Sequence, residues 1–176
     1  MTTRFKEFNE EVFYATGDIM DVSWEDVAFL KGKALANGRK RIRLCAHKDV
    51  NDALHEMLII HTQGVYVRPH KHLNKSESIH VIEGSADVVI FDEQGKIAEA
   101  VPMGEYASKR KFYFRMSGPH YHTFIVHSKF FIFYETTKGP FQKADTIFGP
   151  WAPEENNPES CRTYMQKLSE RIARKI

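Results

Sequence analysis

The sequence has little cysteine, little net charge and no long apolar run. Its 176 residues hold only two cysteines, Cys45 and Cys161, and no Cys-x-x-Cys pair. This scarcity argues against a disulfide-stabilised secreted fold or a cysteine-based zinc site, and it favours a reducing compartment. No apolar stretch approaches the roughly 18–20 residues that a membrane-spanning helix needs. The first residues include early acidic side chains and no apolar core of a signal peptide, so we expect a cytoplasmic protein without a membrane partner.

The charges are almost balanced, with 25 Lys and Arg against 23 Asp and Glu, which leaves a net charge of +2. This balance argues against nucleic acid as a partner. Two basic runs, at residues 39–43 and 109–111, are interpreted as solvated turns and edges of strands. A patch for a phosphorylated or sugar-acid ligand is the alternative interpretation of these runs.

The middle of the chain, residues 42–141, is typical of short strands. Thirteen Phe and seven Tyr against ten Gly favour a β-rich core. Runs rich in Val, Ile, Phe and Tyr occupy residues 41–47, 53–62, 65–72, 78–84, 86–92, 111–116, 122–127 and 130–136. Turn signals separate them, and "FDEQGKI" predicts a hairpin. Eight such strands predict an antiparallel sandwich or barrel within a single domain.

The two flanking segments predict one helix each. In residues 1–41, "EEVFYAT" favours an edge strand, and Ser23 with Asp26 forms a box-like helix start that Asn37-Gly38 ends. In residues 142–176, a Pro-rich stretch precedes a helix with Asn157 as its cap and Pro158 at its first position. Its apolar stripe predicts docking on the barrel, or on a second copy in a homodimer.

One short stretch carries residues with clear chemical capacity. His70 and His72 are two residues apart in a strand, so both imidazoles point to one face. Asn74 and Lys75 can turn the chain, which brings Glu77 onto a neighbouring strand. Two imidazoles and a carboxylate that face a barrel interior predict a site for a transition metal.

A further metal donor is expected from "GPHYHTFIVH". His122 is preferred because it opens a strand, whereas His120 lies in the preceding turn and is the alternative ligand or a substrate contact. His120 and Arg68 are the candidates for proton transfer and for holding a substrate oxygen.

Other residues are placed by parity or position in the strands. His80 is expected to face away from the metal, His61 to lie at a rim and His47 to line the mouth of the pocket. Tyr66 and Tyr113 are expected either to line the cavity or to pack in the core. Glu135, at a strand end, is a candidate base.

The spacing from Gly64 to Gly84 resembles the first cupin motif, G-x5-H-x-H-x3–4-E-x6-G, at every defined position. The second cupin motif fits only loosely, because the spacing in this sequence exceeds that of the motif by one residue and Val126 stands where an Asn is usual. The resemblance implies a cupin double-stranded β-helix, that is, a jelly-roll barrel with peripheral helices.

A narrower resemblance covers about residues 39–153. The R-x-R step at Arg41, "YVRPHKH", "VVIFDEQGKI" and "FFIFYETTKGPF" are similar to the WbuC family of small cupin-fold metalloproteins. This similarity implies a metal centre and an association with surface polysaccharide biosynthesis.

Two functions fit these observations. The first is a metal-dependent enzyme, an isomerase, epimerase or dioxygenase, that acts on a sugar or sugar-nucleotide-like molecule through Fe, Mn, Zn, Ni or Co. The second is a non-catalytic, metal-loaded protein that binds a small-molecule ligand. The predicted metal ligands are His70, His72, Glu77 and His122 in both cases.

Overall fold

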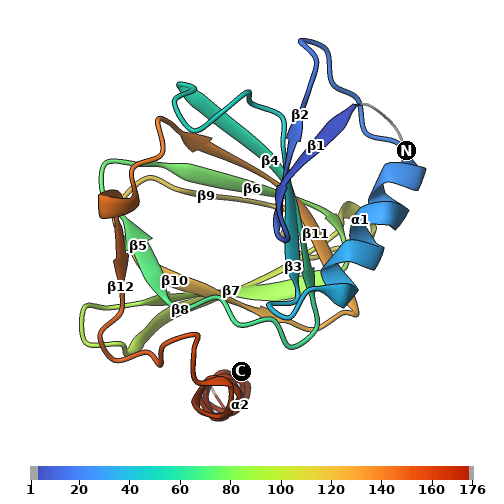
Figure 1. Cartoon of the computed structure of the whole chain (residues 1–176). Helices are drawn as coiled ribbons and strands as arrows, with labels where there is room; N and C mark the ends of the chain where they lie inside the picture. Colours follow the sequence, from blue (N-terminus) through green and yellow to red (C-terminus); the bar gives the residue numbers. More distant parts are fainter. Residues whose placement is uncertain (1–3, 175–176) are drawn as a thin grey trace.

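The computed structural model describes residues 4–174, which form two β-sheets packed face to face with one helix on the outside of each (Figure 1). The twelve strands are β1 (Phe5–Asn9), β2 (Val12–Ala15), β3 (Arg41–Cys45), β4 (Leu54–Thr62), β5 (His70–His72), β6 (Glu77–Glu83), β7 (Ser85–Phe91), β8 (Ile97–Gly104), β9 (Tyr113–Met116), β10 (Tyr121–Val126), β11 (Phe130–Lys138) and β12 (Thr146–Phe148). The helices are α1 (Trp24–Ala36) and α2 (Pro158–Ala173), with short 3₁₀ turns at Tyr106–Ser108 and Lys143–Asp145.

The larger sheet has the order β1-β2-β3-β4-β11-β6-β9 and the smaller one β12-β5-β10-β7-β8. All pairs are antiparallel except β2 with β3. The non-sequential neighbours, such as β4 beside β11 and β5 beside β10, are those of a jelly roll. The expected all-β fold with peripheral helices is therefore confirmed.

Most predicted strands are present, but two differences bear on the site. The run at residues 65–72 is a strand only over its last three residues, which form β5. Strand β12 was not expected, and it pairs with β5 along the edge of the smaller sheet, with Thr146 opposite His72. The strands of the flanking segments thus extend both sheets.

The main core lies between the sheets and follows from the alternation of side chains along the strands. Apolar residues from both inner faces fill part of this space, among them Val81, Val88, Met103, Phe131 and Phe133, all buried. The cavity described below borders this core, and its wall combines apolar side chains, including Phe133, with polar and ionisable ones.

Helix α1 covers the outer face of the larger sheet. Ser23 caps it as expected, because the Ser23 hydroxyl accepts from the Asp26 amide and the Asp26 carboxylate accepts from the Ser23 amide. Leu30 and Ala34 are fully buried and pack in a cluster with Ile42 of β3. The predicted start and end of this helix are confirmed.

Helix α2 covers the outer face of the smaller sheet. The Asn157 side chain accepts from the Ser160 amide, and Pro158 occupies the first turn. Leu168 and Ile172 are buried against Val89 and Phe91 of β7. The apolar stripe of α2 therefore packs on the barrel of its own chain. Within residues 4–174 no helix has the length and apolar character to cross a bilayer.

Candidate metal centre

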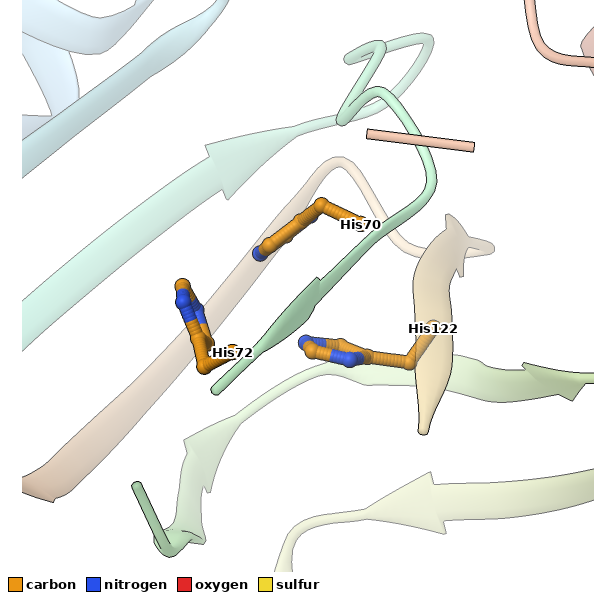
Figure 2. A group of neighbouring side chains, drawn as sticks. All are labelled: His70, His72 and His122. Carbon is orange, nitrogen blue, oxygen red and sulfur yellow. The ribbon is translucent and has the colours of Figure 1, made fainter. Parts of the chain in front are cut away.

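Three histidine side chains meet at the inner face of the smaller sheet. His70 and His72 come from β5, and His122 comes from the neighbouring strand β10, where it pairs directly with His70. Their candidate ligand atoms all lie within 4.8 Å of one another. Figure 2 shows the three rings turned toward a common point. The strand parity that predicted a shared face for His70 and His72 is thus confirmed.

Glu77 reaches the same point from the other sheet. It is the first residue of β6 and is only 5% exposed. One carboxylate oxygen lies 2.9 Å from His122 Nε2, and the other lies 3.7 Å from His72 Nε2. The four side chains therefore form one cluster, in which Glu77 contacts two of the three imidazoles.

The second nitrogen of each ring is held by an oxygen of the protein. His70 Nδ1 lies 2.9 Å from the Arg68 carbonyl, and His122 Nδ1 lies 3.0 Å from the His120 carbonyl. His72 Nδ1 lies 3.2 Å from the Thr146 hydroxyl. When Nδ1 donates to an oxygen, the lone pair is on Nε2, which is the arrangement of a metal-binding histidine.

The electrostatics keep the site in a form that can bind a cation. Burial, and then the neighbouring histidines, lower the pKa of His70 to about 3, and burial also lowers the pKa of His72. Burial opposes ionisation of Glu77, but the attraction of His122 outweighs it and lowers its pKa to about 2. Burial likewise opposes protonation of His122, yet Glu77 raises its pKa to about 8. Neutral imidazoles and an ionised carboxylate are the forms that bind metals, and a cation would replace the proton shared by His122 and Glu77.

The cluster lies in the wall of a cavity of about 730 Å³ between the sheets. This volume is within the usual range for small-molecule sites. Apolar side chains of Met57, Ile59, Phe124 and Phe133 form much of the wall. Arg68 also lines it, with its guanidinium 4.9 Å from the centre of the Phe148 ring.

A second carboxyl group faces this cavity. Glu135 of β11 is half-buried, and its carboxyl group forms neither a hydrogen bond nor an ion pair with any residue between 4 and 174. Burial, and then the nearby Glu77, raise its pKa to about 7. Its position in the strand therefore places a titratable group in the same cavity as the histidine cluster.

Several expectations about individual residues are wrong. The His120 side chain is exposed and does not line the cavity, so only its carbonyl serves the centre. His61 is not at a rim: it is 5% exposed, and its ring packs edge-on against Phe124 and Phe133. Tyr113 is 54% exposed on β9, outside the cavity.

Three other histidine and tyrosine placements are settled by their contacts. Tyr66 is turned to the outside, where its hydroxyl donates to the Pro153 carbonyl. His80 is exposed and faces away from the centre, as predicted. His47 lines the cavity as predicted, but it is buried, with its ring stacked on His55 at 4.0 Å between centroids.

Two contributors were missed by sequence reasoning. Thr146 orients His72 from β12, a strand too short to give an alternating pattern. Arg43 lines the cavity from β3, although the preferred interpretation of its basic run was a solvated edge, with a ligand patch as the alternative. The pattern of β4 could have indicated this position. Arg43 pairs with Ile59, whose side chain points inward, so the two side chains share the inner face of the sheet.

Comparisons with solved structures agree with this architecture. Protein SO0799 from Shewanella oneidensis superposes with a TM-score of 0.54 at 11% identity over 73% of this chain and 85% of its own. A cupin domain of Cnp3 from Schizosaccharomyces pombe gives a TM-score of 0.44 at 14% identity, over 56% of this chain and 64% of its own. Oxalate decarboxylase from Bacillus subtilis gives 0.44 at 20% identity, over 56% of this chain. The chain spans only 24% of the length of that decarboxylase. The likeness to SO0799, together with the strand topology, shows that the chain has a jelly-roll fold.

The sequence comparisons give no activity. A family model described as a domain of unknown function, DUF6016, matches residues 22–103. That region includes His70, His72 and Glu77 but ends before His122. No curated protein matches the chain. The matching model is not that of the WbuC family, so the narrower resemblance of the sequence is not confirmed.

Proposed function

We propose that the protein is a metal-dependent enzyme whose centre is built by His70, His72, Glu77 and His122. The observation that carries this proposal is the convergence of three oriented imidazoles and one ionised carboxylate on the wall of a cavity large enough for a small molecule. Each ring is fixed by an oxygen at its other nitrogen, which a solvated histidine pair would not require.

The donor set fits a divalent transition metal such as Fe, Mn, Zn, Ni or Co. When bound, such a metal supplies Lewis-acid polarisation of a substrate carbonyl or hydroxyl, or redox chemistry. Four protein donors leave one or two positions for substrate oxygens in a five- or six-coordinate ion.

The protein's own side chains supply the remaining functions. Phe124 and Phe133 exclude water from the inner wall. Glu135, with its pKa raised to about 7 by burial and by Glu77, can hold or release a proton near neutral pH. These features suit isomerisation or epimerisation next to a carbonyl group, in which a proton leaves one carbon and returns to the same or a neighbouring atom.

The finer part of the proposal concerns the substrate. We infer an oxygen-rich small molecule, of the sugar or sugar-nucleotide type used in surface polysaccharide biosynthesis. The cavity volume and the oxygen-binding character of the centre support the size and chemistry, and the resemblance to WbuC-like sequences supports the biological setting.

The test combines metal analysis with a turnover screen. Purified wild-type protein, His72→Ala and His80→Ala are analysed for metal content, reloaded with each candidate metal, and incubated with a panel of sugar nucleotides and small carbonyl compounds. His80 lies on the same sheet as Glu77 but faces solvent, so its replacement controls for the loss of an imidazole as such.

We expect stoichiometric metal in the wild type and in His80→Ala, and a loss of both metal and turnover in His72→Ala. Metal binding with ligand-dependent thermal shifts but no product would replace the enzyme by the non-catalytic binding protein. Equal metal content in all three proteins would contradict the proposed centre itself.

A further inference from the structure

The cationic side chains around the cavity fall into two classes. In the first class, Arg39 and Arg41 are paired with Glu11 of the turn between β1 and β2, and both also contact Glu155 of the C-terminal segment. The Arg41 Nε lies 3.0 Å from Glu11. These two charges are already neutralised by carboxylates of the protein, so they leave little attraction for a ligand.

Arg43 lies two residues further along β3 on the same inward face and also lines the cavity. Its guanidinium has no ion pair or hydrogen bond with any residue of the described range, 4–174, although the side chain is half-buried. A guanidinium removed from water without a partner is costly, and a bound anion would offset that cost.

Lys75 is the second such cation. It follows the turn at Asn74 and lines the same cavity, with its ammonium 5.1 Å from the centre of the Phe141 ring. Within the described part of the chain no carboxylate forms an ion pair with it. An aromatic face is a weak partner for an ammonium group and leaves its donors available.

Glu135 lines the same cavity, but its carboxyl group forms no ion pair with Arg43 or Lys75 among residues 4–174. Burial, and then Glu77, raise the pKa of Glu135 to about 7, although Arg43 and Lys75 both act in the opposite direction. The two cations therefore influence the same region of the cavity without forming an ion pair there. His61 adds an unsatisfied atom to this wall, because its buried Nδ1 has no hydrogen-bond partner within residues 4–174.

We propose that Arg43 and Lys75 form an anion-binding subsite, so that the substrate class is an acidic small molecule carrying a carboxylate or phosphate group. The inference rests on the proposed function in that the acidic group would occupy the same cavity as the metal centre. The apolar or hydroxylated part of that small molecule would lie against Phe124 and Phe133.

Calorimetric titration of the full chain tests this subsite without relying on turnover. The probes are benzoate, its neutral counterpart benzamide, succinate and inorganic phosphate, each titrated into metal-loaded and metal-free protein. Succinate and phosphate distinguish a carboxylate site from a phosphate site. Hydrogen bonds to charged groups are strong enough that losing one weakens binding about tenfold to a hundredfold.

We expect at least one acid to bind, benzoate at least tenfold more tightly than benzamide, and higher salt to weaken that binding. Arg43→Gln is expected to weaken acid binding about tenfold to a hundredfold. Arg41→Gln is the matched control, because Arg41 lies on the same strand and face but is already paired; it should change binding by less than about twofold. Lys75→Gln tests the second anchor and decides the question if Arg43→Gln does not fold.

Failure of any acid to bind, equal binding of benzoate and benzamide, or equal losses in Arg43→Gln and Arg41→Gln would overturn the subsite. These outcomes are separable from failure of the metal centre, because acid binding to metal-free protein, and its loss in Arg43→Gln or Lys75→Gln, does not require the ion. Acid binding that depends on Arg43 would support the subsite even if the protein held no metal.

Discussion

Each imidazole of the centre uses its two nitrogens differently, and this division determines what the site can bind. The Nδ1 atoms are held by the carbonyls of Arg68 and His120 and by the Thr146 hydroxyl. These contacts fix the ring planes before a ligand arrives, so little rotamer freedom is lost on binding. Two of the three partners are backbone atoms, which substitution of a side chain does not remove.

Thr146 is the exception, and it provides the first prediction. Thr146→Val keeps the shape of the side chain but removes the oxygen that lies 3.2 Å from His72 Nδ1. We expect metal affinity, measured by competition with a chromogenic chelator, to fall about tenfold to a hundredfold. Thr136→Val, on β11 and away from the cavity wall, should leave affinity unchanged. Equal affinities for both variants would show that Thr146 does not orient His72.

The burial of His61 predicts a dependence of stability on pH. Burial, with a smaller effect of Arg43, lowers the pKa of His61 to about 3, whereas an unfolded histidine titrates near 6.5. Protons therefore bind the unfolded chain first as the pH falls. The contribution of His61 to stability is complete above about pH 6.5 and is lost progressively down to about pH 3.

For metal-free protein, His61→Leu should remove about 2 kcal/mol of the stability loss that the wild type shows between pH 7 and 5. Urea denaturation at the two pH values measures this difference. His80→Gln, at an exposed position, should retain the pH dependence of the wild type. If the His61→Leu and wild-type curves fell in parallel, His61 would not be a buried neutral imidazole.

The residues of the centre could be predicted from the sequence because the motif fixes both their spacing and their chemical type. The placement of His61 was not readable, because its position before a turn suggested exposure while the packing of Phe124 and Phe133 from other strands buries it. The interior role of Arg43 was hidden for a related reason. Parity places Arg43 on a face with Arg41, but only the fold brings Glu11 and Glu155 to Arg41 and leaves the Arg43 guanidinium without such a partner among residues 4–174.

At the scale of elements, the hairpin β7–β8 depends on the packing of Trp151 against its turn as well as on the turn itself. Gly95 adopts a positive φ of 78°, and a Cβ there would come within 2.4–2.7 Å of three Trp151 ring atoms. Trp151 also packs on Phe91 of β7 and on Tyr164 of α2. One glycine thus permits the C-terminal segment to close over the hairpin.

Gly95→Ala should therefore lower the free energy of unfolding by about 1–3 kcal/mol, from left-handed backbone strain and from displacement of Trp151. Gly38→Ala is the matched control, because nothing lies within 4 Å of its added Cβ and its φ is not positive; it should change stability by less than about 0.5 kcal/mol. Denaturant titration followed by tryptophan fluorescence measures both variants. Equal effects would show that Trp151 yields without cost.

Elements with a strong local signal were predictable, and those defined by distant pairing were not. The helix caps at Ser23 and Asn157 are local hydrogen bonds, so the sequence contains the whole motif. Strand β12 has three residues, and its pairing with β5 exists only because the fold brings residue 146 beside residue 72. Such a strand has no periodicity of its own to detect.

At the scale of the whole molecule, the centre joins the two sheets. His70, His72 and His122 belong to the five-stranded sheet, whereas Glu77 belongs to the seven-stranded one. A cation bound by all four would stabilise the native state alone, because the unfolded chain does not hold these side chains together. Metal binding and the association of the sheets are therefore thermodynamically linked.

Loading the protein with a metal at a hundred times its dissociation constant should add about 2.7 kcal/mol of stability. For a chain of this size that raises the melting temperature by about 5–10 °C, and chelation should reverse it. Differential scanning calorimetry measures the shift, and His72→Ala should show little of it. A Glu77→Gln variant with the full shift would indicate that the ion is held by one sheet only.

The border of the cavity has an implication for engineering. It is assembled from three unconnected stretches of chain, because Arg41 of β3 is linked both to Glu11 near the start and to Glu155 near the end. None of these residues belongs to the cluster that would hold the cation. Changes in the length or charge of these stretches could therefore alter the size of the ligand that enters the cavity. The cluster that would hold the cation would stay unchanged.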